Sequence, residues 1–229
     1  MAQLGHSAWI RIPCPDMPAS VEAWSAIGFD PIVGAALALY TDGQRIIELI
    51  PGDRGLPSVV YGNASPARTA QQCKDRGAPS TLTSSGEVQF GGIGLLQVFL
   101  CEMPIKEALH NDGEQNPLLG YHDHLVVHVD DLDACKRRCE AMGLLVLDQM
   151  HGEKPSIDVT DGAVTLSLRT LPVAGIPIEY SADIDELLLA DLRLVLGDNV
   201  SAVLDDNGEP VLIRLTMPEG TCIIIGRDE

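Results

Sequence analysis

Basic residues are scarce in this chain of 229 residues: 15 lysines and arginines stand against 33 aspartates and glutamates, and the formal net charge is −18. Proteins that bind nucleic acids draw much of their affinity from Lys and Arg side chains that neutralise phosphates. A strongly negative chain instead repels polyanions and anionic surfaces. Aromatic residues are also few, at 4%, and no basic run is present. The composition therefore argues against DNA, RNA and anionic membranes as partners.

Long apolar stretches are absent as well. No apolar run approaches the roughly 20 residues that a membrane-spanning helix needs, and the first residues lack the pattern of a signal peptide. We therefore expect a cytoplasmic protein. The cysteines form no CxxC pair, which argues against a zinc knuckle or a dithiol redox motif. Cys135 and Cys139 share one face of a predicted helix, and we interpret them as small core residues in a reducing compartment. The other cysteines are Cys14, Cys73, Cys101 and Cys222.

Several common catalytic motifs are missing too. The sequence contains no GxSxG nucleophile elbow, no Walker phosphate loop and no dinucleotide-binding glycine fingerprint. The glycines at positions 91, 92 and 94 fit a hairpin with a turn at Gly91-Gly92, not the passage from a strand to a helix. The usual motifs of α/β-hydrolases, P-loop NTPases and Rossmann enzymes are therefore not found.

What the sequence does contain is an internal repeat, which is clearest at residues 121–143. This stretch predicts a strand that carries three histidines, then an N-cap at Asp131, then a helix that ends at Gly143. A spacing of 12 residues between capping residue and terminal glycine occurs four times. The pairs are Asp16 and Gly28, Ser65 and Gly77, Asp131 and Gly143, and Asp185 and Gly197, with Asp183 as an alternative cap for the last helix.

Each repeat predicts the element order β-α-β-β-β. In the first repeat, the expected strand, helix and three further strands are residues 6–13, 16–28, 31–33, 36–40 and 44–50. A Thr-Asp-Gly hairpin turn occurs at corresponding places in the first and third repeats, at residues 41–43 and 160–162. One such unit cannot bury both faces of its sheet, so the units must pair. The polar segment 105–120 predicts a linker between one domain at residues 1–104 and another at residues 121–229.

The chain resembles the vicinal oxygen chelate superfamily, which includes glyoxalase I, bleomycin-resistance and fosfomycin-resistance proteins, and extradiol dioxygenases. Residues 124–132, HLVVHVDDL, are similar to that family's first-strand pattern, in which a ligand and alternating apolar residues precede an acidic cap. Residues 46–49, IIEL, resemble the last-strand pattern, in which a glutamate binds metal. The resemblance implies an α+β fold of four βαβββ modules that pair into two cupped-sheet, glyoxalase-like domains.

Family members that use a metal bind a divalent ion with ligands from the first and last strands of two units. Here the first-strand positions hold Trp9, Ser58, His124 and Ile178, and the last-strand positions hold Glu48, Gln97, Ser167 and Ile225. The register of the fourth unit is set only to within a residue or two. No pairing of the units yields three or four ligands. His124 and Glu48 remain the candidate metal ligands, not necessarily in the same site. His6, or His151 and Glu153 in a longer loop, are the alternatives that could complete a site.

Three histidines of one predicted strand, His122, His124 and His128, alternate so that all point to the same face. His124 and His128 are about 13 Å apart along such a strand, so they cannot bind one ion. They can instead transfer protons or hydrogen-bond an anionic ligand. Arg11 shares the face of Trp9 and either contacts a ligand or is an exposed strand arginine. We expect a ligand cavity lined by Trp9, Arg11, Glu48, Gln97, His122, His124 and His128.

Two functions are consistent with these observations. The first is a protein that binds a small molecule in a cupped-sheet cavity, with an incomplete or absent metal site, no cofactor, and a monomeric or homodimeric state. The alternative is a lyase, isomerase or dioxygenase that depends on a divalent metal, Fe, Mn, Ni or Zn, at a non-standard site around His124. A third possibility is an interaction module whose cavities are filled by side chains.

Overall fold

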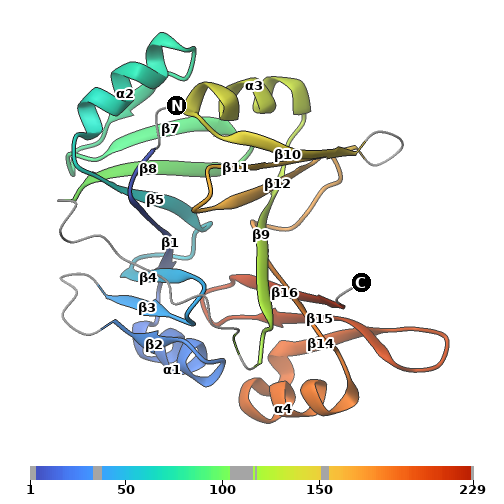
Figure 1. Cartoon of the computed structure of the whole chain (residues 1–229). Helices are drawn as coiled ribbons and strands as arrows, with labels where there is room; N and C mark the ends of the chain where they lie inside the picture. The colour runs from blue at the N-terminus through green and yellow to red at the C-terminus, as the bar shows by residue number, and fades with distance from the viewer. Residues whose placement is uncertain (1–3, 33–37, 104–115, 117, 151–154, 228–229) are drawn as a thin grey trace. The chain divides into compact units, whose positions relative to one another are not determined.

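The computed structural model describes residues 4–32, 38–103, 116, 118–150 and 155–227. The fold is α+β and consists of four βαβββ modules, as the sequence predicts (Figure 1). The first module comprises β1 (Ser7–Cys14), α1 (Met17–Ala26), β2 (Asp30–Pro31), β3 (Leu39–Thr41) and β4 (Ile46–Pro51). The second comprises β5 (Ser58–Asn63), α2 (Pro66–Asp75), β6 (Ser80–Leu82), β7 (Val88–Ile93) and β8 (Leu96–Glu102).

The other two modules repeat this order. The third comprises β9 (Tyr121–His128), α3 (Leu132–Met142), β10 (Leu145–Met150), β11 (Ser156–Thr160) and β12 (Thr165–Arg169). The fourth comprises β13 (Ile178–Ala182), α4 (Glu186–Leu196), a short 3-10 helix η2 (Gly197–Asn199), β14 (Val200–Leu204), β15 (Pro210–Thr216) and β16 (Cys222–Arg227). None of the helices in the described ranges has the length and apolarity that crossing a membrane requires.

The four capping residues predicted from the repeat are the N-caps of the four helices. Asp16, Asp131 and Asp185 each accept a hydrogen bond from the backbone N–H three residues on, at 3.2, 2.8 and 2.7 Å. Ser65 occupies the same position without a side-chain hydrogen bond. A glycine with positive φ follows each helix, as at Gly143, where φ is 102°. Side chains with a Cβ rarely adopt that conformation, which explains why the repeat ends on glycine.

The two Thr-Asp-Gly turns also form as predicted. Asp42 accepts hydrogen bonds from two backbone amides at 2.9 and 2.7 Å, and Asp161 does the same at 3.0 and 3.2 Å. These bonds satisfy amides that the hairpin ladder leaves unpaired. The two turns therefore share one local structure.

The expected turn at Gly91-Gly92 is wrong. Strand β7 continues to Ile93 through an irregularity in its pairing with β8, between Phe90 and Ile93. The chain reverses later, at Gly94, where φ is +51°. A Cβ at Gly94 would overlap the carbonyl oxygen of His128, so only glycine fits there. Two adjacent glycines can form a bulge as readily as a turn. Here the contact between Gly94 and His128 decides between a bulge and a turn.

The strands form two mixed sheets of eight strands each. Their orders are β2-β3-β4-β1-β5-β8-β7-β6 and β10-β11-β12-β9-β13-β16-β15-β14. The first sheet thus contains modules one and two, and the second contains modules three and four, as expected for two glyoxalase-like domains. Within the modules β5 runs parallel to β8 and β9 to β12, whereas consecutive hairpin strands are antiparallel. The domain boundaries stay a prediction, because most of the expected linker lies outside the described residues.

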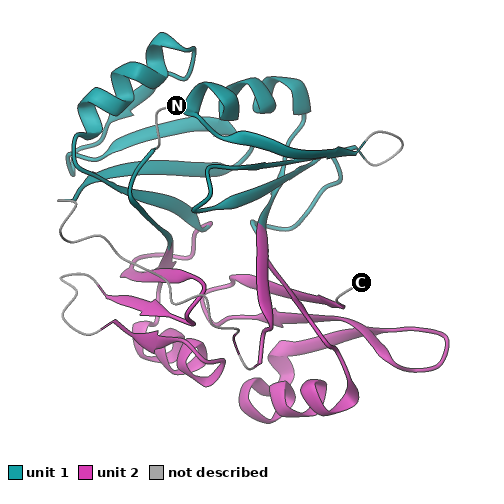
Figure 2. Ribbon diagram, in the orientation of Figure 1, with its two compact units in different colours: residues 1–10, 57–110, 125–176 teal, residues 11–56, 111–124, 177–229 magenta. Residues whose placement is uncertain are grey.

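The chain also packs as two compact units, shown in Figure 2. Unit 1 contains residues 1–10, 57–110 and 125–176, and unit 2 contains residues 11–56, 111–124 and 177–229. Unit 1 therefore combines mainly modules two and three, and most of its buried side chains are apolar. A small space between β5, β8 and β12 in this unit has a volume of about 10 Å³, which is room for a single water at most.

Unit 2, which combines modules one and four, contains a buried carboxylate. Glu219 is only 2% exposed. It accepts hydrogen bonds from the Ser20 hydroxyl at 2.8 Å and from the Trp24 indole N–H at 3.0 Å. Trp24 packs edge-on against Phe29, with ring centroids 4.8 Å apart. Because both carboxylate oxygens are bonded, Glu219 stabilises the packing of module one on module four within this unit.

The cysteines are all free, and most of them are core residues. Burial raises the pKa of the Cys14 and Cys73 thiols and raises that of Cys139 to about 12. These three thiols stay protonated at neutral pH, so they are poor nucleophiles and poor metal ligands. Cys135 and Cys139 are core residues, as the sequence predicts, whereas Cys101 and Cys222 are partly exposed.

The two caps of unit 1 allow a matched test of the repeat. We expect Asp131→Ala to lower the free energy of unfolding by about 1 kcal/mol, because it removes the hydrogen bond to the Ala134 amide. Ser65→Ala should have a smaller effect, since Ser65 makes no side-chain cap bond. Urea unfolding of both variants provides the measurement. Equal losses would contradict the assignment of Asp131 as the stronger cap.

Candidate functional site

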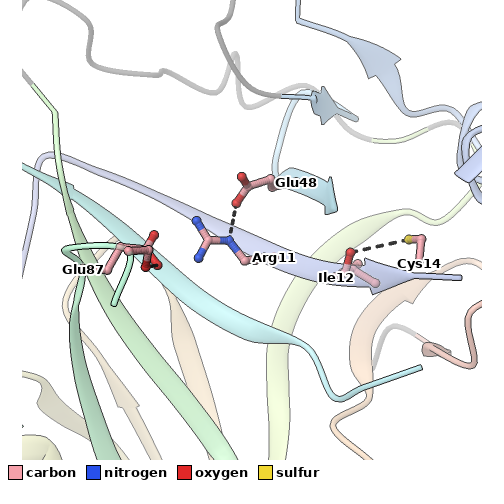
Figure 3. A network of polar contacts seen from close by, with 6 residues as sticks. Arg11, Ile12, Cys14, Glu48 and Glu87 are labelled. Carbon is pink, nitrogen blue, oxygen red and sulfur yellow. Dashed lines mark hydrogen bonds and ion pairs between the residues drawn. The ribbon is translucent and has the colours of Figure 1, made fainter. Parts of the chain in front are cut away.

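Glu48, the last-strand candidate of module one, is held in an ion pair. Arg11 on β1 donates from Nε to Glu48 Oε2 on β4, at 2.6 Å, and Figure 3 shows the two side chains pointing toward one another. The Glu48 side chain is 4% exposed and that of Arg11 is 16% exposed. Both belong to unit 2. A guanidinium beside a buried carboxylate satisfies it both electrostatically and by a charge-assisted hydrogen bond.

The other expected ligand positions give few metal donors. Trp9 is buried at 1% exposure, and Gln97 is exposed. Ser167 is buried and accepts a hydrogen bond from Arg169 Nε at 3.1 Å. The remaining positions are buried serine or isoleucine: Ser58, Ile178 and Ile225.

His124 is paired with a residue that the repeat did not identify. Its Nε2 lies 2.7 Å from Oε2 of Glu179 on β13, and the two side chains are 18% and 17% exposed. Both residues belong to unit 2. The pair is a hydrogen-bonded imidazole and carboxylate that solvent can reach.

Glu179 was missed because the strand of module four is displaced by one residue relative to its cap. In β9 the partly exposed His124 lies seven positions before the cap Asp131. In β13 the buried residues lie seven, five and three positions before the cap, while Glu179 is partly exposed. A shift of one residue exchanges the two faces of a strand. Counting seven residues back from the cap selected Ile178, which is buried. The alternation of apolar and polar residues within β13 would have selected its neighbour Glu179 instead.

His122 lies in a second polar cluster of unit 2, around the buried Tyr180. The Tyr180 hydroxyl donates to Asp42 Oδ2 at 2.9 Å. The His122 ring packs edge-on against Tyr180, with centroids 5.2 Å apart, and its backbone N–H donates to Gln44 Oε1 at 3.0 Å. Gln44 also donates from Nε2 to the Gly120 carbonyl at 2.7 Å. The Thr-Asp-Gly turn of module one thus anchors residues from β9 and β13.

Titration of these two rings is strongly perturbed. Burial lowers the pKa of His122 well below its usual value, with the positive charges of Arg45 and His124 adding to the effect. Both ring nitrogens of His122 are buried without a hydrogen-bond partner in the described structure. Burial, reinforced by the Asp42 carboxylate, raises the pKa of Tyr180 well above its ordinary range. His122 is therefore neutral and Tyr180 remains a hydrogen-bond donor at neutral pH.

His128 belongs to a different environment from the other two histidines of β9. It lies in unit 1, with Nδ1 3.1 Å from the Leu171 carbonyl oxygen and Nε2 3.5 Å from the Asp130 carboxylate. His6 is assigned to unit 1 and Glu48 to unit 2, and residues 151 and 153 lie outside the described ranges. Whether the seven expected residues line one ligand cavity stays a prediction.

The donor set does not fit the metal centre that the resemblance implies. Within the ranges described above, no three side chains of histidine, cysteine, aspartate or glutamate are placed to hold one ion. The two candidates are separately engaged, Glu48 with Arg11 and His124 with Glu179. A divalent site of the usual kind needs three or more protein ligands. What these residues offer instead is a set of satisfied charges and hydrogen-bonding groups.

Neither a protein-family model nor a curated protein matches the sequence. Solved structures do match. A catechol 2,3-dioxygenase is 14% identical with a TM-score of 0.61, over 100% of this chain and 89% of that one. The homoprotocatechuate 2,3-dioxygenase of Arthrobacter globiformis is 13% identical with a TM-score of 0.65, over 99% and 80%. The Mn(II)-bound glyoxalase of Novosphingobium aromaticivorans is 13% identical with a TM-score of 0.59, over 96% and 80%.

At these identities the likeness shows the fold. The chain has the vicinal oxygen chelate fold over nearly its whole length, as the resemblance implies. The chemistry of the matched proteins does not transfer with the fold, because function depends on the residues of the site.

The buried His122 predicts a pH dependence of stability. In the unfolded chain this imidazole binds a proton near pH 6.5, whereas in the folded chain it stays neutral to well below that pH. The unfolded state then binds more protons, so stability falls as the pH drops below 6.5, by up to about 1.4 kcal/mol per pH unit. His122→Gln should remove this part of the slope.

Urea unfolding between pH 7.5 and pH 5 measures the effect. His128→Gln is the matched control, since His128 lies on the same strand but is more exposed. Identical pH slopes for the wild-type protein and His122→Gln would contradict the burial of the neutral ring.

Proposed function

We propose that this chain is a small-molecule-binding protein that uses its cupped sheets without a complete metal site. The observation that carries this proposal is the pairing of Glu48 with Arg11 at 2.6 Å. Glu48 is, with His124, one of the two residues that resemble a family metal ligand, and a guanidinium is bonded to its carboxylate. A divalent cation at Glu48 would have to displace that guanidinium or sit beside a positive charge, and both cost free energy.

The His124–Glu179 pair supports the same proposal. With about a sixth of each side chain exposed, a polar group of a ligand can reach both an imidazole and a carboxylate. Such a pair can hydrogen-bond a hydroxyl, amide or amine group. A binding protein needs a few such groups among apolar walls, not an open metal coordination position.

The setting that we propose follows from composition. A net charge of −18 disfavours nucleic acids and anionic membranes as partners, and six free cysteines suit a reducing compartment such as the cytoplasm. The protein acts as a monomer or homodimer and needs no cofactor. A small molecule is the partner that these properties favour.

One observation favours a second candidate function. His124 and Glu179 supply one nitrogen and one carboxylate at 2.7 Å, which are two of the donor types found in non-haem iron and related sites. A divalent-metal-dependent lyase, isomerase or dioxygenase would need a further ligand to complete this site. Fe, Mn, Ni or Zn would then polarise a substrate oxygen.

Metal analysis separates the two candidates. In protein purified without chelator or affinity tag, we expect well under one equivalent of Fe, Mn, Ni or Zn per chain. The content should be the same in His124→Ala and in the control His128→Ala, and none of these ions should raise the melting temperature. Elemental analysis by mass spectrometry and thermal unfolding provide the measurements.

The enzyme alternative gives the opposite result. One equivalent of metal that is lost in His124→Ala and Glu179→Gln, but retained in His128→Ala, would contradict the metal-free proposal. All three variants alter exposed or partly exposed side chains. Comparing their metal contents therefore separates a specific site from adventitious binding.

A further inference from the structure

Three arginines meet at a surface pocket of unit 1, apart from the pairs described above. Its volume is about 440 Å³. The lining residues are Arg76 and Gly77 at the end of α2, Gly92 in β7, and Ala134, Arg137 and Arg138 on α3. All of them belong to unit 1, and we call this site the arginine pocket.

Local structure positions two of the three guanidinium groups. Arg138 donates from Nη1 to the Gly77 carbonyl at 3.3 Å, and Arg76 donates from Nε to the Gln72 carbonyl at 3.2 Å. A Cβ at Gly92 would lie 2.8 Å from Arg138 Nη2. The glycine of the β7 irregularity therefore makes room for the Arg138 guanidinium.

These arginines have no carboxylate partner in the described part of the chain. Arg11, by contrast, forms an ion pair with Glu48. Asp75, next to Arg76 in the sequence, instead accepts a hydrogen bond from Gln71 at 2.7 Å. Bases are outnumbered more than two to one by acids in this chain, so three unpaired arginines at one pocket call for an explanation.

Capping of the α2 C-terminus explains only part of the arrangement. Arg76 and Arg138 bond carbonyl oxygens at that end of the helix, where cations are favoured. Arg137 makes no hydrogen bond or ion pair with any described residue, yet it lines the same pocket. Placing three positive charges together costs repulsion, which an anion would offset.

We propose that the arginine pocket binds the phosphate group of a small molecule. Guanidinium groups present planar pairs of donors that match phosphate oxygens, and three of them neutralise the charge of a phosphate or pyrophosphate. The field of the whole protein repels large polyanions, so a compact anion suits the pocket better than a nucleic acid. The site is in unit 1 and does not depend on the function proposed for the Arg11–Glu48 and His124–Glu179 pairs.

Calorimetric titration with inorganic pyrophosphate and with phenyl phosphate, at low salt, tests the proposal. We expect saturable binding of at least one probe, with a Kd about tenfold higher in Arg137→Gln. Arg138→Lys keeps the charge but loses the paired donors, and it should also weaken binding. Arg68→Gln is the matched control, because this exposed arginine of α2 lies outside the pocket and its loss changes the net charge equally.

Stronger binding of phenyl phosphate would identify a phosphate ester as the natural ligand, and stronger binding of pyrophosphate would identify a free phosphate anion. Failure of both probes to saturate would overturn the proposal. So would an equal loss of affinity in Arg68→Gln and Arg137→Gln, which would indicate a general charge effect. Arg137 makes no contact that folding needs in the described structure, so Arg137→Gln should retain the wild-type unfolding midpoint.

Discussion

A βαβββ module has one helix and a sheet with two faces, so it cannot bury its apolar surface alone. The rest of this structure depends on that constraint. Neighbouring modules share a sheet, while the compact units combine modules two with three and one with four. Unit 1 buries mainly apolar side chains, together with the hydrogen-bonded pair Asn63 and Thr69. Unit 2 adds buried polar pairs, Glu219 with Ser20 and Trp24, and Asp42 with Tyr180, and its candidate site lies next to this second pair.

The need to satisfy buried polar groups also explains why no complete set of metal ligands is found among the described residues. A buried carboxylate must be satisfied, and Arg11 satisfies Glu48 from the neighbouring strand. Glu179 does the same for His124. The two residues expected as metal ligands, Glu48 and His124, are thus each bonded to another side chain. The fold thereby keeps a polar, partly accessible surface suited to binding.

Local sequence rules predicted most of the fold and less of the site. The caps Asp16, Asp131 and Asp185 and their glycines follow from chemistry within a few residues, so spacing alone located the four helices. Glu179 was missed because a displacement of one residue in β13 cannot be seen from the cap. The Tyr180–Asp42 bond joins residues 138 positions apart, and the arginine pocket joins two helices. Contacts between residues so far apart in the sequence depend on how the modules pack. The periodicity of the sequence does not predict that packing.

We propose that side chains, not a metal ion, bind Glu48 and His124. Anomalous diffraction from crystals grown with excess Mn²⁺ tests it most directly. We expect no manganese peak at either pair, with the Arg11–Glu48 and His124–Glu179 contacts intact. A peak within coordination distance of His124 Nε2 and the Glu179 carboxylate would contradict this expectation and establish a metal centre.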